Sequence, residues 1–126
     1  MREAGVLIDL KTNEPLYWHA PAGRSCAYLP DSRDLWEVIW EHRGKILGFA
    51  HSHPGSGVPV PSHEDLTTFR AIEAALGTSL AWWITSSDVF AMIVPVDYRS
   101  WSYVTVPYRI FPKWLDELRR ISHTEE

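Results

Sequence analysis

Residues 51–65 carry the side chains whose types and spacing are best suited to chemistry. His51 and His53 are separated by one residue and followed by Pro54, and Asp65 comes after a short loop. Two imidazoles and a carboxylate suit a catalytic zinc ion, whose fourth position is left to water. In a strand, residues i and i+2 project to the same face, so both histidines can reach one ion. The pattern predicts a zinc site.

Each part of this pattern also has a simpler explanation. A His-x-His pair is often structural or merely exposed. Ser62-His63-Glu64-Asp65 fits a helix capping box, with serine at the N-cap and an acid at N3, although Glu or Gln is more usual at N3. The joint occurrence of His-x-His-Pro, seven further residues and Ser-x-x-Asp favours the metal site over these separate explanations.

Other zinc signatures fit the sequence less well. Nucleobase deaminases combine His-x-Glu with Pro-Cys-x-x-Cys, whereas this sequence has one cysteine, Cys26, which we expect in the core. A His-Glu-x-x-His helix is absent from the sequence. A His-x-His amidohydrolase would need a barrel of about 250 residues, which is far longer than this chain.

The elements around the motif are expected to bring its residues together. A strand over 45–52 delivers the histidines at its C-terminal end, and a loop rich in Pro and Gly follows. A helix over 62–76 then presents Asp65 in its first turn, and Gly77 ends it. Hydrophobic periodicity predicts further strands at 5–10, 16–19, 24–29, 80–85, 89–96 and 103–106, and helices at 31–42 and 112–121.

These elements predict the fold class. Strands and helices are interleaved, and hairpin connections make the sheet mixed. We therefore expect an α/β or α+β sandwich in which helices flank a mixed central β-sheet. A chain of 126 residues has the length of a single domain, spanning residues 1–126.

Charge and hydropathy exclude several classes of partner. The net charge is −4, which argues against a nucleic-acid binder, because such proteins usually carry a basic stripe. No apolar run reaches about 18 residues, so we expect no membrane span. The charged start leads into a short apolar segment broken by Asp9, unlike a signal peptide. A cytoplasmic location is expected.

The motif resembles that of a known family. His51-Ser52-His53-Pro54, seven residues, Ser62, two residues and Asp65 resemble the JAMM motif of the JAB1/MPN/Mov34 metalloproteases at every defining position. The family pattern also has an upstream glutamate, a small pair and an apolar strand. The stretch Glu3-Ala4-Gly5-Val6-Leu7-Ile8 resembles this segment, with Ala4 where Cys is frequent. The resemblance implies the cytidine-deaminase-like JAB/MPN fold.

The resemblance also implies roles for five residues. His51, His53 and Asp65 would bind one zinc ion per chain, completed by a bound water. Glu3 would act as general base and then as proton donor, and Ser62 would help to hold the oxyanion. The implied reaction is hydrolysis of a peptide or isopeptide bond by zinc-activated water.

The position of Glu3 departs from the family pattern. Family members usually have a helix before the glutamate strand, whereas Glu3 is the third residue of this sequence. Because chain termini fray unless they are tied down, Glu3 is either poorly positioned or held by another chain or another segment that covers that side. Glu14, Glu37 and Glu41 are alternative bases that fit less well, because none precedes a small pair and an apolar strand.

The chain leaves little room for the long insertions that eukaryotic deubiquitinases of this family use to grip ubiquitin. This favours the compact prokaryotic type. The implied substrate is a ubiquitin-like or sulfur-carrier protein, or its conjugate, cut near the C-terminal tail. In the phage-related branch the implied role is processing during tail assembly. Two alternatives stay open, a non-catalytic binding or scaffold module and a hydrolase of small peptide or amino-acid conjugates. The sequence does not indicate an oligomeric state.

Overall fold

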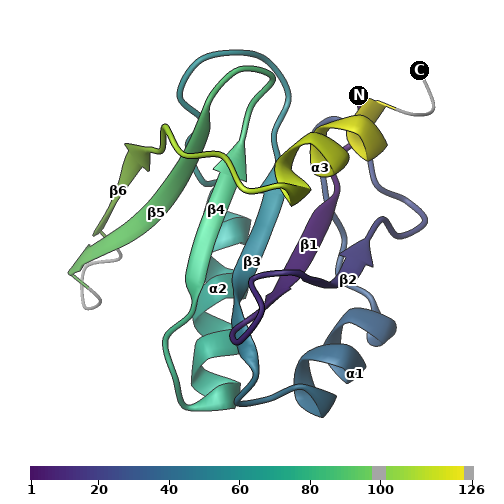
Figure 1. Ribbon diagram of the computed structural model, residues 1–126, viewed down its shortest axis with the longest axis vertical. Coiled ribbons are helices and arrows are strands. Elements are labelled where there is room, and N and C mark those ends of the chain that lie inside the picture. The colour runs from purple at the N-terminus through teal and green to yellow at the C-terminus, as the bar shows by residue number, and fades with distance from the viewer. Residues whose placement is uncertain (98–101, 124–126) are drawn as a thin grey trace.

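A mixed sheet lies at the centre of the fold, in a computed structural model that describes residues 1–97 and 102–123 (Figure 1). Its strand order is β2-β1-β3-β4-β5-β6. Strands β3 and β4 run parallel, and the other neighbouring pairs run antiparallel. The strands are β1 (Gly5–Asp9), β2 (Pro15–His19), β3 (Ile46–Ser52), β4 (Ala81–Thr85), β5 (Phe90–Asp97) and β6 (Ser102–Pro107). The helices are α1 (Arg33–Glu41), α2 (His63–Leu76) and α3 (Trp114–His123).

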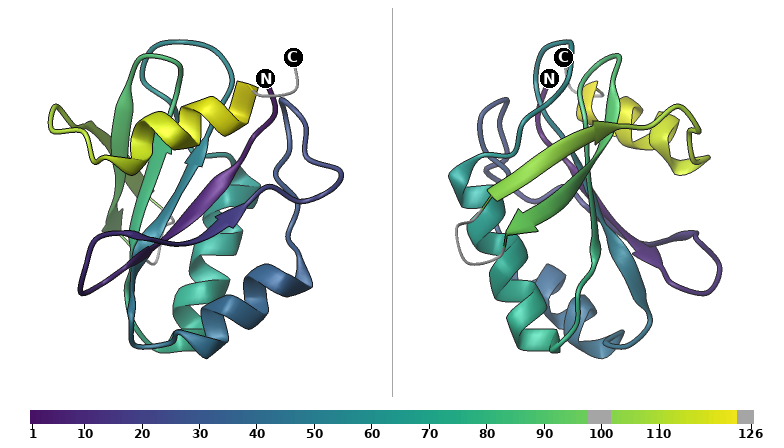
Figure 2. Two further views of the ribbon diagram at one scale, coloured as in Figure 1. Left: turned by 45° about the vertical axis from the view of Figure 1, so that its right-hand side comes forward. Right: turned by 90° about the vertical axis from the view of Figure 1, so that its left-hand side faces the viewer.

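Helices cover both faces of the sheet, as Figures 1 and 2 show. Helices α1 and α2 pack on one face through Leu35, Ile39, Phe69 and Ile72. Helix α3 packs on the other face through Trp114, Leu115 and Leu118. Burying an apolar stripe of each helix against the sheet stabilises this three-layer arrangement. The predicted mixed sheet with flanking helices is confirmed.

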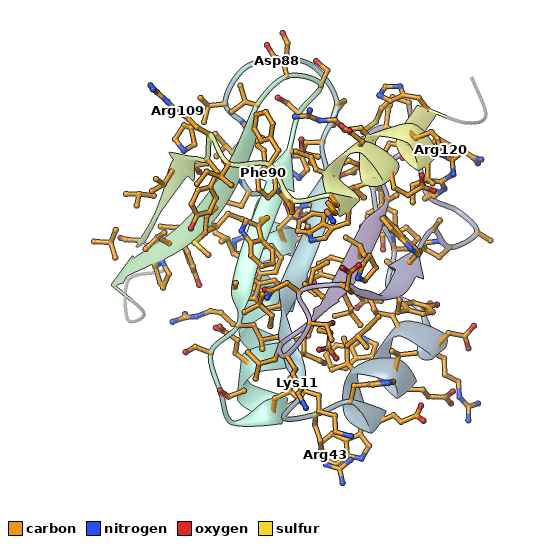
Figure 3. The ribbon with its side chains drawn as sticks, in the orientation of Figure 1. Lys11, Arg43, Asp88, Phe90, Arg109 and Arg120 are labelled. Atoms are coloured by element: carbon orange, nitrogen blue, oxygen red, sulfur yellow. The ribbon has the colours of Figure 1, made fainter. Side chains whose placement is uncertain are left out.

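The layer beneath α3 is built on aromatic side chains. Phe90 of β5 is buried, and its ring lies 5.6 Å from that of Trp114 and 6.5 Å from that of Trp83. Figure 3 shows Phe90 within the molecule and the side chains of Lys11, Arg43 and Arg120 at its periphery. Packing of these aromatic rings therefore holds α3 against its face of the sheet.

Strand β3 positions the chemistry because its side chains alternate between the two faces. Phe49 and His51 face α1 and α2, and the His51 ring lies 5.9 Å from the ring of Phe69. Ala50 and Ser52 face α3. The end of this strand therefore presents an imidazole to the α2 side and a hydroxyl to the α3 side.

Two glycines allow close approach next to β3. A Cβ atom on Gly48 would lie 2.0 Å from the carbonyl oxygen of Ala81 in β4. A Cβ atom on Gly5 would lie 2.2 Å from Cζ of Phe49, whose ring covers this position. Both sites admit glycine alone without a shift of neighbouring atoms, so they fix how closely β1, β3 and β4 pack.

Most predicted elements are confirmed with ends shifted by one or two residues, but the predicted strand over 24–29 is wrong. This segment forms a turn, in which the amide of Ser25 donates to the carbonyl of Tyr28 at 2.9 Å. Gly23 enters the turn with φ +86°, which an extended strand does not allow. The expectation that Cys26 lies in the core is also wrong, because the turn exposes it. No helix in the described ranges is long and apolar enough to cross a membrane.

Candidate metal centre

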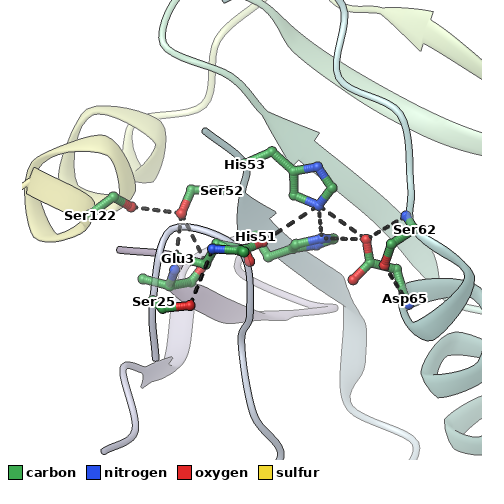
Figure 4. Close-up of polar contacts among 10 residues, drawn as sticks. Glu3, Ser25, His51, Ser52, His53, Ser62, Asp65 and Ser122 are labelled. Carbon is green, nitrogen blue, oxygen red and sulfur yellow. Dashed lines mark hydrogen bonds and ion pairs between the residues drawn. The ribbon is translucent and has the colours of Figure 1, made fainter. Parts of the chain in front are cut away.

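Three potential ligand atoms converge where β3 ends and α2 begins (Figure 4). Nε2 of His51 lies 2.9 Å from Nε2 of His53. Oδ2 of Asp65 lies 3.0 Å from the His53 nitrogen and 3.2 Å from the His51 nitrogen. In a tetrahedral zinc site with ligands at about 2.0–2.1 Å, neighbouring ligand atoms are about 3.3 Å apart. The three atoms can therefore hold a zinc ion after a movement of tenths of an ångström.

Hydrogen bonding alone does not account for this convergence. Nε2 of His53 lies near His51, Asp65 and Oε1 of Glu3, the last at 3.6 Å. An imidazole nitrogen carries at most one proton, so it cannot donate to all three. Several electron-rich atoms directed at one point are better satisfied by a cation between them.

His51 and His53 belong to two possible sets of metal ligands, one completed by Asp65 and the other by Glu3. Glu3, His51 and His53 offer atoms that all lie within 4.8 Å of one another. Oδ2 of Asp65 lies 3.0 Å from Nε2 of His53, whereas Oε1 of Glu3 lies 3.6 Å from the same nitrogen, and Oδ2 of Asp65 also lies 3.2 Å from Nε2 of His51. The geometry therefore favours Asp65 as the third ligand and leaves the carboxylate of Glu3 beside the site.

Two other segments of this chain contact Glu3 and its neighbour Arg2. The amide of Glu3 donates to the carbonyl of Ser25 at 2.8 Å, and Arg24 Nη1 donates to the carbonyl of Glu3 at 3.3 Å. The amide of Arg2 donates to the carbonyl of Ser122, at the C-terminal end of α3, at 2.8 Å. The side chain of Glu3 is only 7 % exposed. The turn and α3 therefore fix this residue, as Figure 4 shows in part.

A buried pair of hydroxyls completes this support. Ser122 Oγ donates to Ser52 Oγ at 2.7 Å, and Ser52 Oγ accepts from the amide of Ala4 at 2.9 Å. Ser52 lies between the two histidines in sequence but points to the opposite face. The sequence motif did not reveal this role, because Ser52 and Ser122 are 70 residues apart and no local pattern links them.

The helix cap and the metal site coexist at the start of α2. Ser62 Oγ accepts from the amide of Asp65 at 3.1 Å, and Oδ2 of Asp65 accepts from the amide of Ser62 at 2.9 Å. This is the capping box expected from the sequence. The same Oδ2 faces the histidines, so the cap holds the carboxylate in the orientation that a metal ligand needs.

The two carboxylates differ in their electrostatics. Burial raises the pKa of Glu3 from 4.5 to about 7, with His53 opposing and Asp65 reinforcing the change. Burial also tends to raise the pKa of Asp65, but the charge of His51 and hydrogen bonds from His51, His53 and Ser62 outweigh it and hold that pKa well below its usual range. Asp65 therefore stays ionised at neutral pH, whereas Glu3 can exchange a proton near neutral pH.

An open cavity of about 600 Å³ lies in front of these residues. Glu3, His53, Ser62 and Asp65 form part of its surface, together with the turn around Tyr28. Among the described residues, the cluster of potential ligands contains none of the alternative bases. Glu37, for example, pairs with Arg33 on the exposed side of α1 at 2.8 Å. A substrate can therefore reach the candidate ligands and Glu3 together.

Comparison with known proteins identifies the family. A family model described as prokaryotic homologues of the JAB domain matches residues 4–104, from β1 into β6. The match includes His51, His53, Ser62 and Asp65, and it begins at the residue after Glu3. A search of curated proteins gave no match. Because the match covers well over half of the chain, and the mixed sheet flanked by helices agrees with it, the chain belongs to the prokaryotic homologues of the JAB domain.

Proposed function

We propose that the protein is a zinc-dependent metallopeptidase that hydrolyses a peptide or isopeptide bond. One observation carries this proposal. Three potential ligands lie within 3.2 Å of one another, beside a buried carboxylate whose pKa is about 7, at the surface of an open cavity. Membership of the JAB family supports the same reaction.

In this proposal, His51, His53 and Asp65 hold one zinc ion. When bound, the ion supplies Lewis-acid chemistry, because it lowers the pKa of water and polarises a carbonyl group. Glu3 accepts the proton that the attacking water loses, and it then delivers this proton to the nitrogen of the leaving amine. Its raised pKa suits both steps, since a group with a pKa near the working pH can accept and return a proton.

Ser62 is proposed to stabilise the developing oxyanion. Its Oγ accepts from the amide of Asp65, and that contact leaves the hydroxyl proton unused. Ser62 also borders the same cavity as Glu3 and His53. A hydroxyl fixed in this position can donate to the negative charge that forms on the carbonyl oxygen during attack.

We propose as substrate the C-terminal tail of a ubiquitin-like or sulfur-carrier protein or of its conjugate, cleaved in the cytoplasm. The cavity in front of Glu3 admits a flexible segment, whereas a folded domain would stay outside it. The alternatives are a hydrolase of small peptide or amino-acid conjugates and a non-catalytic binding module. The complete set of motif residues favours an enzyme over a binding module.

The test compares zinc-reconstituted wild-type protein with Glu3→Gln and the control Glu37→Gln on ubiquitin-like proteins carrying C-terminal extensions, and on short peptides. We expect cleavage by wild type and Glu37→Gln, and loss of cleavage in Glu3→Gln with zinc content unchanged. Cleavage of short peptides alone would support the small-conjugate alternative. Equal inactivity of all three zinc-loaded proteins would favour the binding module.

A further inference from the structure

A second cavity, of about 200 Å³, lies next to the cavity of the candidate metal centre, because His53 borders both. The ends of β3 and β4 form part of its wall through Ser52 and Thr85, and α3 forms another part through Arg119 and Ser122. Pockets for drug-sized ligands measure about 300–1,000 Å³, so this cavity suits a small group or the end of a chain.

Arg119 borders this cavity from α3. Together with Ser122 and His123 it occupies positions i, i+3 and i+4 of the helix, which share one face, and all three residues border the cavity. Its Nε donates to Oγ1 of Thr85 at 3.1 Å, and its Cζ lies 5.9 Å from the centre of the Phe111 ring. These two contacts hold the guanidinium beside the end of β4, where Thr85 borders the same cavity.

The guanidinium of Arg119 has hydrogen-bond donors to spare. A guanidinium is permanently charged and carries five N–H donors in a planar fork. Its Nε contacts Thr85, and its buried Nη2 has no hydrogen-bond partner among the described residues. A buried donor without a partner is unfavourable, and the planar fork matches the two oxygens of a carboxylate. The chemistry of this side chain therefore favours a carboxylate ligand.

The charged side chains around the two cavities differ in sign. With histidines neutral, those that the structure describes around the first cavity are all acidic, namely Glu3, Asp31, Glu64 and Asp65. Around the second cavity, the described part of the chain places Arg119 and no Asp or Glu. Two neighbouring cavities of opposite charge orient a ligand that spans them, because a carboxylate is repelled from the first and attracted to the second.

We propose that Arg119 binds the free C-terminal carboxylate of the segment that hydrolysis releases. This inference rests on the proposed function and narrows its substrate class. Hydrolysis adds hydroxide to the carbonyl carbon and a proton to the nitrogen, so the released segment begins with an amine at the candidate metal centre and ends in the carboxylate at Arg119. The substrate is therefore a protein tail or peptide that is cut a short distance before its own C-terminus.

The first test measures binding and does not depend on cleavage. Acetyl-Gly-Gly with a free carboxylate, and the same peptide as its amide, are titrated into ¹⁵N-labelled protein at constant ionic strength and followed by NMR. We expect the acid to bind wild type about 10-fold to 100-fold more tightly than the amide, the usual range for a hydrogen bond to a charged group. This difference should disappear in Arg119→Gln and persist in the control Arg120→Gln, because Arg120 is exposed and pairs with Glu117 (Figure 3).

Equal binding of the acid and the amide to wild type would overturn the inference, as would a difference that persists in Arg119→Gln. The titration is made with zinc-loaded and with zinc-free protein, because a carboxylate held by zinc requires the metal, whereas one held by Arg119 does not.

Wild-type protein gives a second readout, which does not depend on the folding of a variant. The Nε–H group of Arg119 donates to Thr85, and this contact slows its exchange with water, so its NMR signal can be followed. We expect the signal to shift when the acid is added and to stay in place with the amide. An unchanged signal with saturating acid would contradict the proposal.

Cleavage by the zinc-loaded protein tests the role of Arg119 in substrate recognition. On peptides that end in a free carboxylate, Arg119→Gln should lower kcat/KM about 10-fold to 100-fold, mainly through KM, with zinc content unchanged. Equal kcat/KM of wild type on acid and amide peptides would overturn the inference. Absence of cleavage by wild type, with acid-specific binding intact, would instead remove the proposed hydrolysis and leave the carboxylate site, so the two failures are distinguishable.

Discussion

The two acidic side chains at the centre owe their different roles to their surroundings. Asp65 accepts a backbone hydrogen bond and lies beside two imidazoles, so it stays ionised. Burial favours the neutral form of Glu3 as well, but there only the charge of His53 opposes it. The same chemical group therefore acts as a ligand in one position and as a proton carrier in the other.

This difference predicts how the stability of the metal-free protein depends on pH. The pKa of Glu3 rises from 4.5 to about 7 on folding, so the native state binds more protons than the unfolded state within that window. The contribution of Glu3 to stability is therefore complete below the lower value and is lost as the pH rises through the upper one. Urea unfolding at several pH values within the window should show a smaller decline for Glu3→Gln than for wild type.

The matched control for this experiment is Glu37→Gln, because Glu37 lies on the exposed side of α1 and pairs with Arg33. Its free energy of unfolding should follow the pH dependence of wild type. If Glu3→Gln also followed wild type across the window, burial would not raise the pKa of Glu3 in the folded protein.

Among the strands and helices, the end of β3 is the point at which three segments meet. Ser52 Oγ contacts Ser122 of α3 and the amide of Ala4, and these contacts hold the segment that carries Glu3. We expect Ser52→Ala to lower the free energy of unfolding by about 1–3 kcal/mol, because it leaves buried polar groups unpaired. It should also reduce catalytic rate more than zinc affinity, since the metal ligands lie on the other face of β3.

Chemical unfolding, zinc titration and the cleavage rate of Ser52→Ala check this prediction. Ser56→Ala, in the exposed loop after β3, is the control and should match wild type in all three measurements. A Ser52→Ala protein with wild-type stability and wild-type activity would show that the buried hydroxyl pair does not support Glu3.

The pairing of β3 with β4 depends on Gly48. A side-chain methyl group there would meet the carbonyl oxygen of Ala81 at 2.0 Å, and backbone atoms cannot yield as a flexible side chain can. We expect Gly48→Ala to destabilise the fold by about 1–3 kcal/mol or more, as overpacking does. Thermal unfolding measures the effect. A melting temperature equal to that of wild type would show that β3 and β4 can move apart at this position without loss of stability.

Elements with strong local signals could be predicted from the sequence, and long-range contacts could not. Three signals within one segment predicted the ends of α2 closely. They are the N-cap Ser62, the C-cap Gly77 and the apolar periodicity between them. The stretch around Cys26 looked extended because its composition resembles a strand, but its turn depends on Gly23 and on pairing with Glu3. The candidate ligands were predictable because their spacing is local.

For the molecule as a whole, the candidate metal centre joins the central sheet to α2. An ion that binds only the folded state stabilises it, by about 2.7 kcal/mol when its free concentration is 100 times the dissociation constant. We therefore expect zinc to raise the melting temperature of wild type and to leave that of His53→Ala unchanged. Differential scanning fluorimetry with and without zinc measures this. An equal rise in both proteins would indicate zinc binding elsewhere.

Zinc content, measured by elemental analysis after reconstitution and desalting, tests the candidate metal centre, and circular dichroism verifies folding. Wild type should retain one zinc ion per chain, and His53→Ala and Asp65→Asn should retain little or none, because each removes one of the three converging ligands. Folded wild-type protein without zinc would show that these residues do not form a zinc site. It would mean that Asp65 and Ser62 serve only as a helix cap, and the binding module would replace the hydrolase as the proposed function.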